Sequence, residues 1–148
     1  MDRKILIMGL PGAGKTTLAR LLAPRLCAVH FNADEVREHL SPDLGFSLAD
    51  RLEQARRMGW LCDQVTRAGG FAIADFVCPT PATREAFCGG GPAVLIWVDR
   101  IAQGRFPDTN RLFVPPERYA LRVTPAGTPE LWAARAEGML RKVAAAVG

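Results

Sequence analysis

Residues 9 to 17 combine three glycines, a lysine and two threonines in a spacing that can hold phosphate groups. They are Gly9, Leu10, Pro11, Gly12, Ala13, Gly14, Lys15, Thr16 and Thr17. Glycines let successive backbone N–H groups face an anion, and a following helix adds its positive dipole end. Lys15 would neutralise the β- and γ-phosphates, while the Thr16 hydroxyl would help to hold Mg²⁺. This P-loop pattern predicts binding of ATP with Mg²⁺; its structural alternative is a glycine-rich turn before an ordinary helix.

Asp34 is a second candidate for chemistry, because it follows an apolar segment at 28–31 that is expected to form a strand. Small kinases place an acidic residue after the second strand, where it can accept the proton of an acceptor hydroxyl. Asp34 and Lys15 are therefore the predicted catalytic residues, and Asp34 and Thr16 the predicted metal-linked residues. The alternative role for Asp34 is that of a helix N-cap, which aspartate often fills.

The elements that position these residues alternate between strands and helices. Strands are predicted at 4–8, 28–31, 71–74, 93–98 and 121–123, and helices at 16–26, 34–40, 48–68, 79–87 and 129–147. Residues 101–116 contain several prolines and no period, so a loop is expected there. The order predicts an α/β P-loop NTPase fold, with a doubly wound, mostly parallel sheet of about five strands and helices on both faces. Asp75 and Asp99 directly follow two strands, at the edge where ligands bind.

Apolar residues in the segment 48–68 recur every three or four positions, which predicts one buried face of a long helix. The members are Leu48, Leu52, Ala55, Met58, Cys62, Val65 and Ala68. The full length of 148 residues suits a single domain, 1–148. No apolar run approaches the length of a membrane span, and the first strand begins within a few residues of the start. A cytoplasmic protein is expected, in the host cytoplasm if the gene belongs to a phage.

Several blocks of sequence resemble the adenylylsulfate kinases. Residues 31–37 are similar to the family pattern LDGDNVR, and residues 43–47 are identical to the family's DLGFS. Asp50-Arg51 and Arg56-Arg57 match the family's DR and the RR of its ENIRR at the same spacings. Residues 75–79 are similar to the family's AFISP. The resemblance implies a P-loop kinase that phosphorylates a hydroxyl of a nucleotide-type acceptor.

The resemblance also implies roles for acceptor-side residues. Arg37 and Arg51 match arginines that hold anionic groups of the acceptor, and Phe46 matches an aromatic that stacks on its base. Phe106 is expected to form the other half of a stacking sandwich, and Gln54 stands where the family has an acceptor-binding asparagine. The alternative for the two arginines is a surface ion pair with Asp34, Glu38 or Asp50.

Departures from the family concentrate on the acceptor side. Asn32 stands where LDGDNVR has its first aspartate, and Asp99 leads almost at once into Gly104-Arg105-Phe106 in place of a basic lid helix. A shorter lid suits a larger acceptor. Residues 75–80 and 108–116 resemble a compact, often phage-encoded offshoot associated with phosphorylating 5-hydroxymethyluracil in DNA.

Three functions follow. The favoured prediction is an ATP- and Mg²⁺-dependent kinase of 5-hydroxymethyluracil in DNA, a step in thymidine hypermodification in a phage genome. The alternative is an adenylylsulfate kinase that phosphorylates the 3′-hydroxyl of adenylylsulfate in sulfate assimilation. The further alternative is a nucleotide-binding protein without catalysis, which the changes at Asn32 and Gln54 would suit. Lys15 with one or more of four arginines, at 84, 100, 105 and 111, is expected to offset charge on the moving phosphoryl group.

Overall fold

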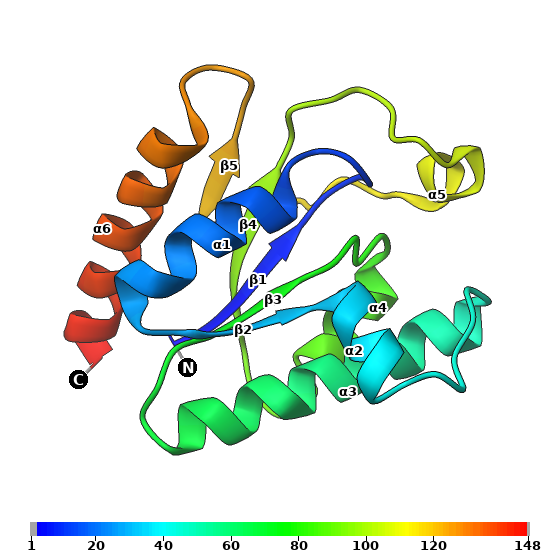
Figure 1. Ribbon diagram of the computed structural model, residues 1–148, viewed down its shortest axis with the longest axis horizontal. Helices are drawn as coiled ribbons and strands as arrows, with labels where there is room; N and C mark the ends of the chain where they lie inside the picture. The colour runs from blue at the N-terminus through cyan, green and yellow to red at the C-terminus, as the bar shows by residue number, and fades with distance from the viewer. Residues whose placement is uncertain (1–2, 148) are drawn as a thin grey trace.

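Five strands form a parallel sheet in the computed structural model, which describes residues 3–147. Their bounds are β1 Lys4–Met8, β2 Val29–Asn32, β3 Ala72–Asp75, β4 Val94–Val98 and β5 Leu121–Val123. The strand order is β2-β3-β1-β4-β5, and every neighbouring pair is parallel (Figure 1). The predicted doubly wound α/β sheet is therefore confirmed. All the carboxyl ends of these strands lie along one edge, as parallel pairing requires.

Helices cover both faces of this sheet. Their bounds are α1 Lys15–Leu26, α2 Ala33–His39, α3 Leu48–Arg67, α4 Pro81–Phe87, α5 Pro107–Leu112 and α6 Pro129–Val147. Figure 1 shows α1 and α6 packed together on one side and α3 with α4 on the other. Side chains of the central strand alternate between the two cores: Ile5 and Ile7 join α1 and α6, while Leu6 and Met8 face α3. Among residues 3–147, no helix has the length and apolarity that crossing a bilayer requires.

The segment predicted as a loop at 101–116 contains α5, so that prediction is wrong for six residues. Pro107 occupies the start of the helix, where its missing N–H has no cost, and Asp108 lies in the first turn, where the helix dipole favours an acid. A helix of fewer than two turns cannot display an apolar period, which is why the sequence pattern did not predict it.

The apolar face of α3 is buried over only part of its length. Ala55, Met58 and Cys62 are fully buried, as predicted, whereas Leu48 is 64% exposed and Leu52 38% exposed. Figure 1 shows the first turns of α3 beside the loop that follows α2, past the end of β2. The sheet therefore covers the middle of α3, and its N-terminal turns remain free to form one wall of a site.

A glycine sets the distance between α3 and α4. A Cβ at Gly59 would lie 2.1 Å from the carbonyl oxygen of Phe87, a backbone atom that cannot move away without separating the helices. We expect Gly59→Ala to lower the melting temperature by roughly 4 °C or more in a thermal denaturation, because overpacking costs about 1–3 kcal/mol.

Gly138→Ala in α6 is the matched control, since a Cβ there meets nothing within 4 Å. It should raise the melting temperature slightly, because alanine favours a helix by up to about 1 kcal/mol over glycine. Equal shifts of the two variants would contradict the steric argument.

Candidate active site

The P-loop joins β1 to α1 and leaves the start of the helix open. Gly14 is the N-cap in a left-handed conformation, with φ 102°, and no side chain caps the first turn. The loop is closed by the Ala13 N–H, which donates to the Leu10 carbonyl over 3.1 Å. Uncapped N–H groups at the start of a helix attract an anion, and the positive φ explains why glycine is needed.

Lys15 folds back over the P-loop. Its Nζ donates to the Leu10 carbonyl over 2.9 Å, and the residue is only 8% exposed. Burial lowers the pKa of Lys15 to about 8, the negative charges of Asp75 and Asp34 raise it in part, and Arg105 lowers it. The ammonium group is thus held close to two carboxylates, at a place where phosphate would replace lost hydration.

A polar cluster forms beside Lys15 where β2 and β3 end. The Thr16 hydroxyl donates to Oδ1 of Asp75 over 3.0 Å, and Nδ2 of Asn32 lies 3.2 Å from Thr16 Oγ1 and 3.3 Å from both Asp75 oxygens. Nε2 of His30 contacts Oδ2 of Asp75. The sequence places Asp75 at the ligand-binding edge, directly after an apolar strand, but it assigns no specific role to Asp75 and none to His30.

Asp34 is not the N-cap of α2. That role belongs to Asn32, whose Oδ1 accepts from the Glu35 N–H over 3.2 Å. Asp34 lies exposed in the first turn and lines a small cavity, and its charge acts on Lys15 of the P-loop. The capping alternative is therefore removed, and within residues 3–147 the Asp34 carboxylate has no hydrogen-bond or ion-pair partner.

The cavity beside Asp34 brings together four of the predicted acceptor residues. It measures about 90 Å³, and its lining includes Asp34, Arg37, Phe46, Arg51 and Gln54. The guanidinium of Arg37 lies 4.4 Å from the centre of the Phe46 ring, and that of Arg51 lies 5.5 Å from it. Phe46 is 67% exposed, so its ring is available for stacking.

Backbone carbonyls hold these two arginines in place. Arg37 Nη1 donates to the Gly45 carbonyl over 2.7 Å, and Arg51 Nε donates to the Phe46 carbonyl over 3.0 Å. Burial, and next the charge of Arg51, lower the pKa of Arg37. Neither arginine forms an ion pair among residues 3–147, which removes the surface ion-pair alternative for that range. Two partly buried cations that have no ion-pair partner among the described residues favour an anionic ligand.

Gln54 is 2% exposed, and only one of its two side-chain polar atoms has a hydrogen-bond partner among the described residues. Its Nε2 donates to the Ala33 carbonyl over 3.4 Å, whereas Oε1 has no partner among the residues that the structure describes. A buried acceptor without a partner is costly, so a ligand donor at this wall of the cavity would be favoured.

Two of the four arginines considered for the donor phosphates lie against the P-loop. A Cβ on Gly14 would lie 3.1 Å from Arg100 Nη1, and a Cβ on Gly12 would lie 3.7 Å from Arg105 Nε. The other two are engaged elsewhere: Arg84 donates to the Cys78 and Val114 carbonyls, and Arg111 pairs with Asp108. Phe106 does not line the acceptor cavity; it lies 56% exposed at the start of α5, and its stacking role stays a prediction.

The oxygen atoms around Thr16 suit Mg²⁺. Hydroxyl and carboxylate oxygens are the ligands this cation prefers, and it usually keeps several waters and binds through substrate phosphates. Within residues 3–147 no group of three or more His, Cys, Asp or Glu side chains is placed to hold a metal by itself. The site therefore fits a cation that binds together with a nucleotide, coordinated in part by its phosphates.

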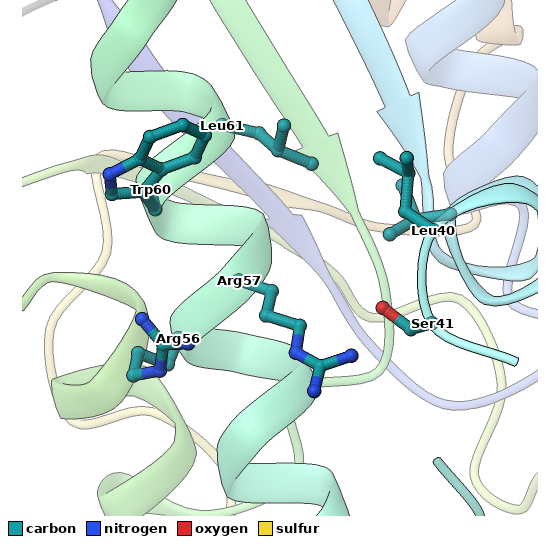
Figure 2. Close-up of a pocket in the computed structure, with 7 residues that line it drawn as sticks. Leu40, Ser41, Arg56, Arg57, Trp60 and Leu61 are labelled. Atoms are coloured by element: carbon teal, nitrogen blue, oxygen red, sulfur yellow. The ribbon is translucent and has the colours of Figure 1, made fainter. Parts of the chain in front are cut away.

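A larger hollow, of about 340 Å³, lies between α3 and the end of α2 with the residues that follow it (Figure 2). It is lined by Val36, Leu40, Ser41, Arg56, Arg57, Trp60 and Leu61. None of these belongs to the P-loop or to the acceptor cavity, and Arg56 and Arg57 are already paired with acids. Its size alone does not make it the site, because the titratable groups converge elsewhere.

Residues 2–89 match the family model described as adenylylsulphate kinase, which is more than half of the chain. The chain belongs to the adenylylsulfate kinase family. An adenylyl-sulfate kinase of Synechococcus sp. (strain JA-3-3Ab) is 44% identical over 82 residues, which cover 52% of this chain and 47% of the relative. The chain thus matches about half the length of such curated relatives.

Solved structures show the same fold. The APS kinase CysC of Mycobacterium tuberculosis, in complex with AMPPNP and APS, aligns with a TM-score of 0.80 at 22% identity, over 94% of this chain and 98% of that chain. The hexameric APS kinase from Thiobacillus denitrificans aligns with a TM-score of 0.77 at 30% identity, over 95% of this chain and 29% of that chain. The P-loop kinase fold is confirmed.

These similarities contradict the prediction of a DNA kinase. The family model and the sequence relatives are adenylylsulfate kinases, and neither DNA modification nor a phage-type offshoot is supported. The short lid was the main reason for that prediction. The short lid is no evidence for a different fold, because the alignment with a solved APS kinase extends over 98% of that kinase's chain.

Proposed function

We propose that this chain transfers the γ-phosphoryl group of ATP to the 3′-hydroxyl of adenylylsulfate. The observation that carries the proposal is a cavity whose lining joins Asp34 to Arg37, Arg51 and Phe46, while the charge of Asp34 also raises the pKa of Lys15 in the P-loop. The family assignment and the solved neighbour in complex with AMPPNP and APS support the same pair of ligands.

The donor half binds ATP through the P-loop. Backbone N–H groups at the start of α1 bind its phosphates, and Lys15 neutralises them. Arg100 and Arg105, the arginines that lie against the P-loop, offset further negative charge on the moving phosphoryl group. Thr16 would help to hold Mg²⁺, which when bound would supply charge neutralisation to the phosphates.

The acceptor half matches the chemistry of adenylylsulfate, which has a planar base and adjoining phosphate and sulfate groups. Arg37 and Arg51 bind the anionic oxygens, and the exposed ring of Phe46 stacks on the base. Gln54 Oε1, without a partner among the described residues, accepts a hydrogen bond from the acceptor. The cavity thereby orients the acceptor toward the P-loop.

Asp34 acts as the base of the reaction. Its carboxylate takes the proton of the 3′-hydroxyl as that oxygen forms a bond to the γ-phosphorus. The bond between the γ-phosphorus and the bridging oxygen of ADP breaks at the same time, and ADP leaves. Most of the catalysis then comes from placing the two reactants in line and from offsetting charge, as is usual for phosphoryl transfer.

The direct test is an assay with purified protein, ATP, Mg²⁺ and adenylylsulfate. The expected result is one ADP for each 3′-phosphoadenylylsulfate, separated by anion-exchange chromatography. ADP formed without the phosphorylated acceptor, or no turnover of adenylylsulfate at all, would refute the proposal.

Arg51→Ala is expected to raise the KM for adenylylsulfate by about 10- to 100-fold, since a hydrogen bond to a charged group contributes about 1.5–3 kcal/mol. The kcat and the KM for ATP should change little, because Arg51 lies on the acceptor side. Arg56→Ala is the matched control: Arg56 lies on the same helix but pairs with Glu53. Steady-state kinetics with each substrate varied in turn would separate the effects. A KM change for ATP alone would contradict the assignment.

A further inference from the structure

Asp75 is a buried carboxylate that the proposed reaction has not yet used. It is the last residue of β3 and 2% exposed. Donors from two other elements surround it: the Thr16 hydroxyl from α1 at 3.0 Å, and the Asn32 amide from the end of β2 at 3.3 Å. His30 contacts its second oxygen. A buried carboxylate is costly unless it is paired, so this convergence on one side chain calls for a function.

An aspartate in place of Asn32 would be unfavourable while Asp75 is present. The two residues are register partners on neighbouring parallel strands. Oδ1 of Asn32 accepts from the Glu35 N–H, and that bond leaves Nδ2 facing Asp75. A carboxylate at position 32 would place a negative oxygen where Nδ2 lies, 3.3 Å from both oxygens of Asp75. Two carboxylates at that distance do not both ionise readily, so the pair of positions holds one negative charge.

The family patterns have the opposite arrangement at both positions. LDGDNVR has its first aspartate at the position of Asn32, and AFISP has alanine at the position of Asp75. In this structure the side chain at position 32 reaches within 3.2 Å of Thr16 Oγ1, so an aspartate there could support the Thr16 hydroxyl as Asp75 does. We propose that the carboxylate that supports this hydroxyl has moved in this chain from the end of β2 to the end of β3. Asp75 is then a positioning residue: it accepts a hydrogen bond from the Thr16 hydroxyl, so that a lone pair of that oxygen, beside the one that accepts from the Asn32 amide, can face the metal of bound MgATP.

The relocation also explains the amide at position 32 and bears on the charge of Lys15. The asparagine at position 32 does not indicate that a metal site has been lost. Its side-chain amide is the neutral hydrogen-bond donor that the Asp75 carboxylate requires. Asp75 is the largest of the charges that raise the pKa of Lys15, so it helps to keep the ammonium group protonated. The inference uses one part of the proposed function, which is that ATP binds with Mg²⁺.

The test is a double-mutant cycle between the two positions. Asp75→Ala, Asn32→Asp and the double variant Asn32→Asp/Asp75→Ala are titrated with a fluorescent ATP analogue, once with Mg²⁺ and once with EDTA. In the wild-type background Asp75→Ala should reduce the Mg²⁺-dependent gain in affinity by at least about 10-fold. In the Asn32→Asp background, Asp75→Ala should change the Mg²⁺-dependent gain in affinity by less than about 3-fold, because the carboxylate at position 32 replaces the one lost at position 75.

A structural role for Asp75 would give a different pattern. Affinity would fall equally with Mg²⁺ and with EDTA, and Asn32→Asp would not restore it; either result would overturn the relocation. Thermal melting of all the variants monitors folding. Asn32→Asp alone should lower the melting temperature at neutral pH, and adding Asp75→Ala should recover it, because the two carboxylates repel each other. If Asp75→Ala does not fold, Asp75→Asn keeps the size and hydrogen-bonding capacity and enters the same cycle.

Adenylylsulfate is absent from these titrations. A protein that binds ATP with Mg²⁺ in the expected pattern, but does not phosphorylate adenylylsulfate, would refute the proposed function and support the relocation. The reverse result, turnover of adenylylsulfate with no coupling between positions 32 and 75, would refute only the relocation.

Discussion

Lys15→Ala is expected to reduce the kcat for adenylylsulfate phosphorylation by about 10³-fold. The Nζ of Lys15 is held over the P-loop by the Leu10 carbonyl, beside the carboxylates of Asp75 and Asp34. No other lysine among the described residues is placed at the P-loop, so the charge of the transferred group would be left without its nearest cation. Steady-state and single-turnover assays measure the loss. Lys142→Ala, an exposed residue of α6, is the control. A variant that kept more than about a tenth of the wild-type kcat would contradict the assignment.

The same lysine predicts a pH dependence for nucleotide binding. Because burial lowers the pKa of Lys15 to about 8, the free protein loses this positive charge as the pH rises through that value. The affinity for MgATP should therefore be higher at pH 7 than at pH 9, as measured by isothermal titration calorimetry. Lys15→Arg keeps its charge across this range, so its affinity should vary less with pH. An equal pH dependence in both proteins would show that another group controls the titration.

Asp34→Ala is expected to lower kcat by about 10²- to 10⁴-fold, the usual contribution of a positioned base. The carboxylate lies exposed in the first turn of α2, and Asn32 rather than Asp34 caps that helix. Its removal should therefore leave the melting temperature nearly unchanged. Asp34→Asn should behave like Asp34→Ala, since the amide keeps the size of the side chain but cannot accept the proton.

Glu35→Ala is the matched control for Asp34, because it is the neighbouring exposed acid in the same turn and faces no described partner through its side chain. Its kcat should stay within about 3-fold of the wild-type value. If Asp34→Ala kept the wild-type kcat, the base would have to be another group, and Asp75 would be the nearest candidate.

The elements that could be predicted were those whose signal is local. β1 and β5 have the predicted bounds. For β1 the reason is a continuous apolar run at 5–8, which is sufficient to indicate a buried parallel strand. The period of α3 predicted its length, but not that Leu48 and Leu52 stay exposed, since burial depends on what lies opposite a helix face. α5 was missed because six residues contain too little pattern.

For the site, the P-loop could be predicted because its residues are contiguous and their chemistry is specific. Arg37, Phe46, Arg51 and Gln54 were found through a resemblance, and the structure brings all four to one cavity. The choice among the four arginines needed the fold, because proximity to Gly12 and Gly14 is set by the return of the chain after β4. The acceptor was predicted wrongly, since lid length is a weak guide to what enters a site.

By itself, the sequence determined the donor chemistry and the alternation of strands and helices, because both depend on neighbours along the chain. Only the tertiary structure decided which charges act together. Asp75, Asn32 and Thr16 lie on three different elements, and their hydrogen bonds exist because parallel strands end at the same edge of the sheet. Electrostatic coupling depends on distances of a few ångströms in space, which the spacing of residues along the sequence does not contain.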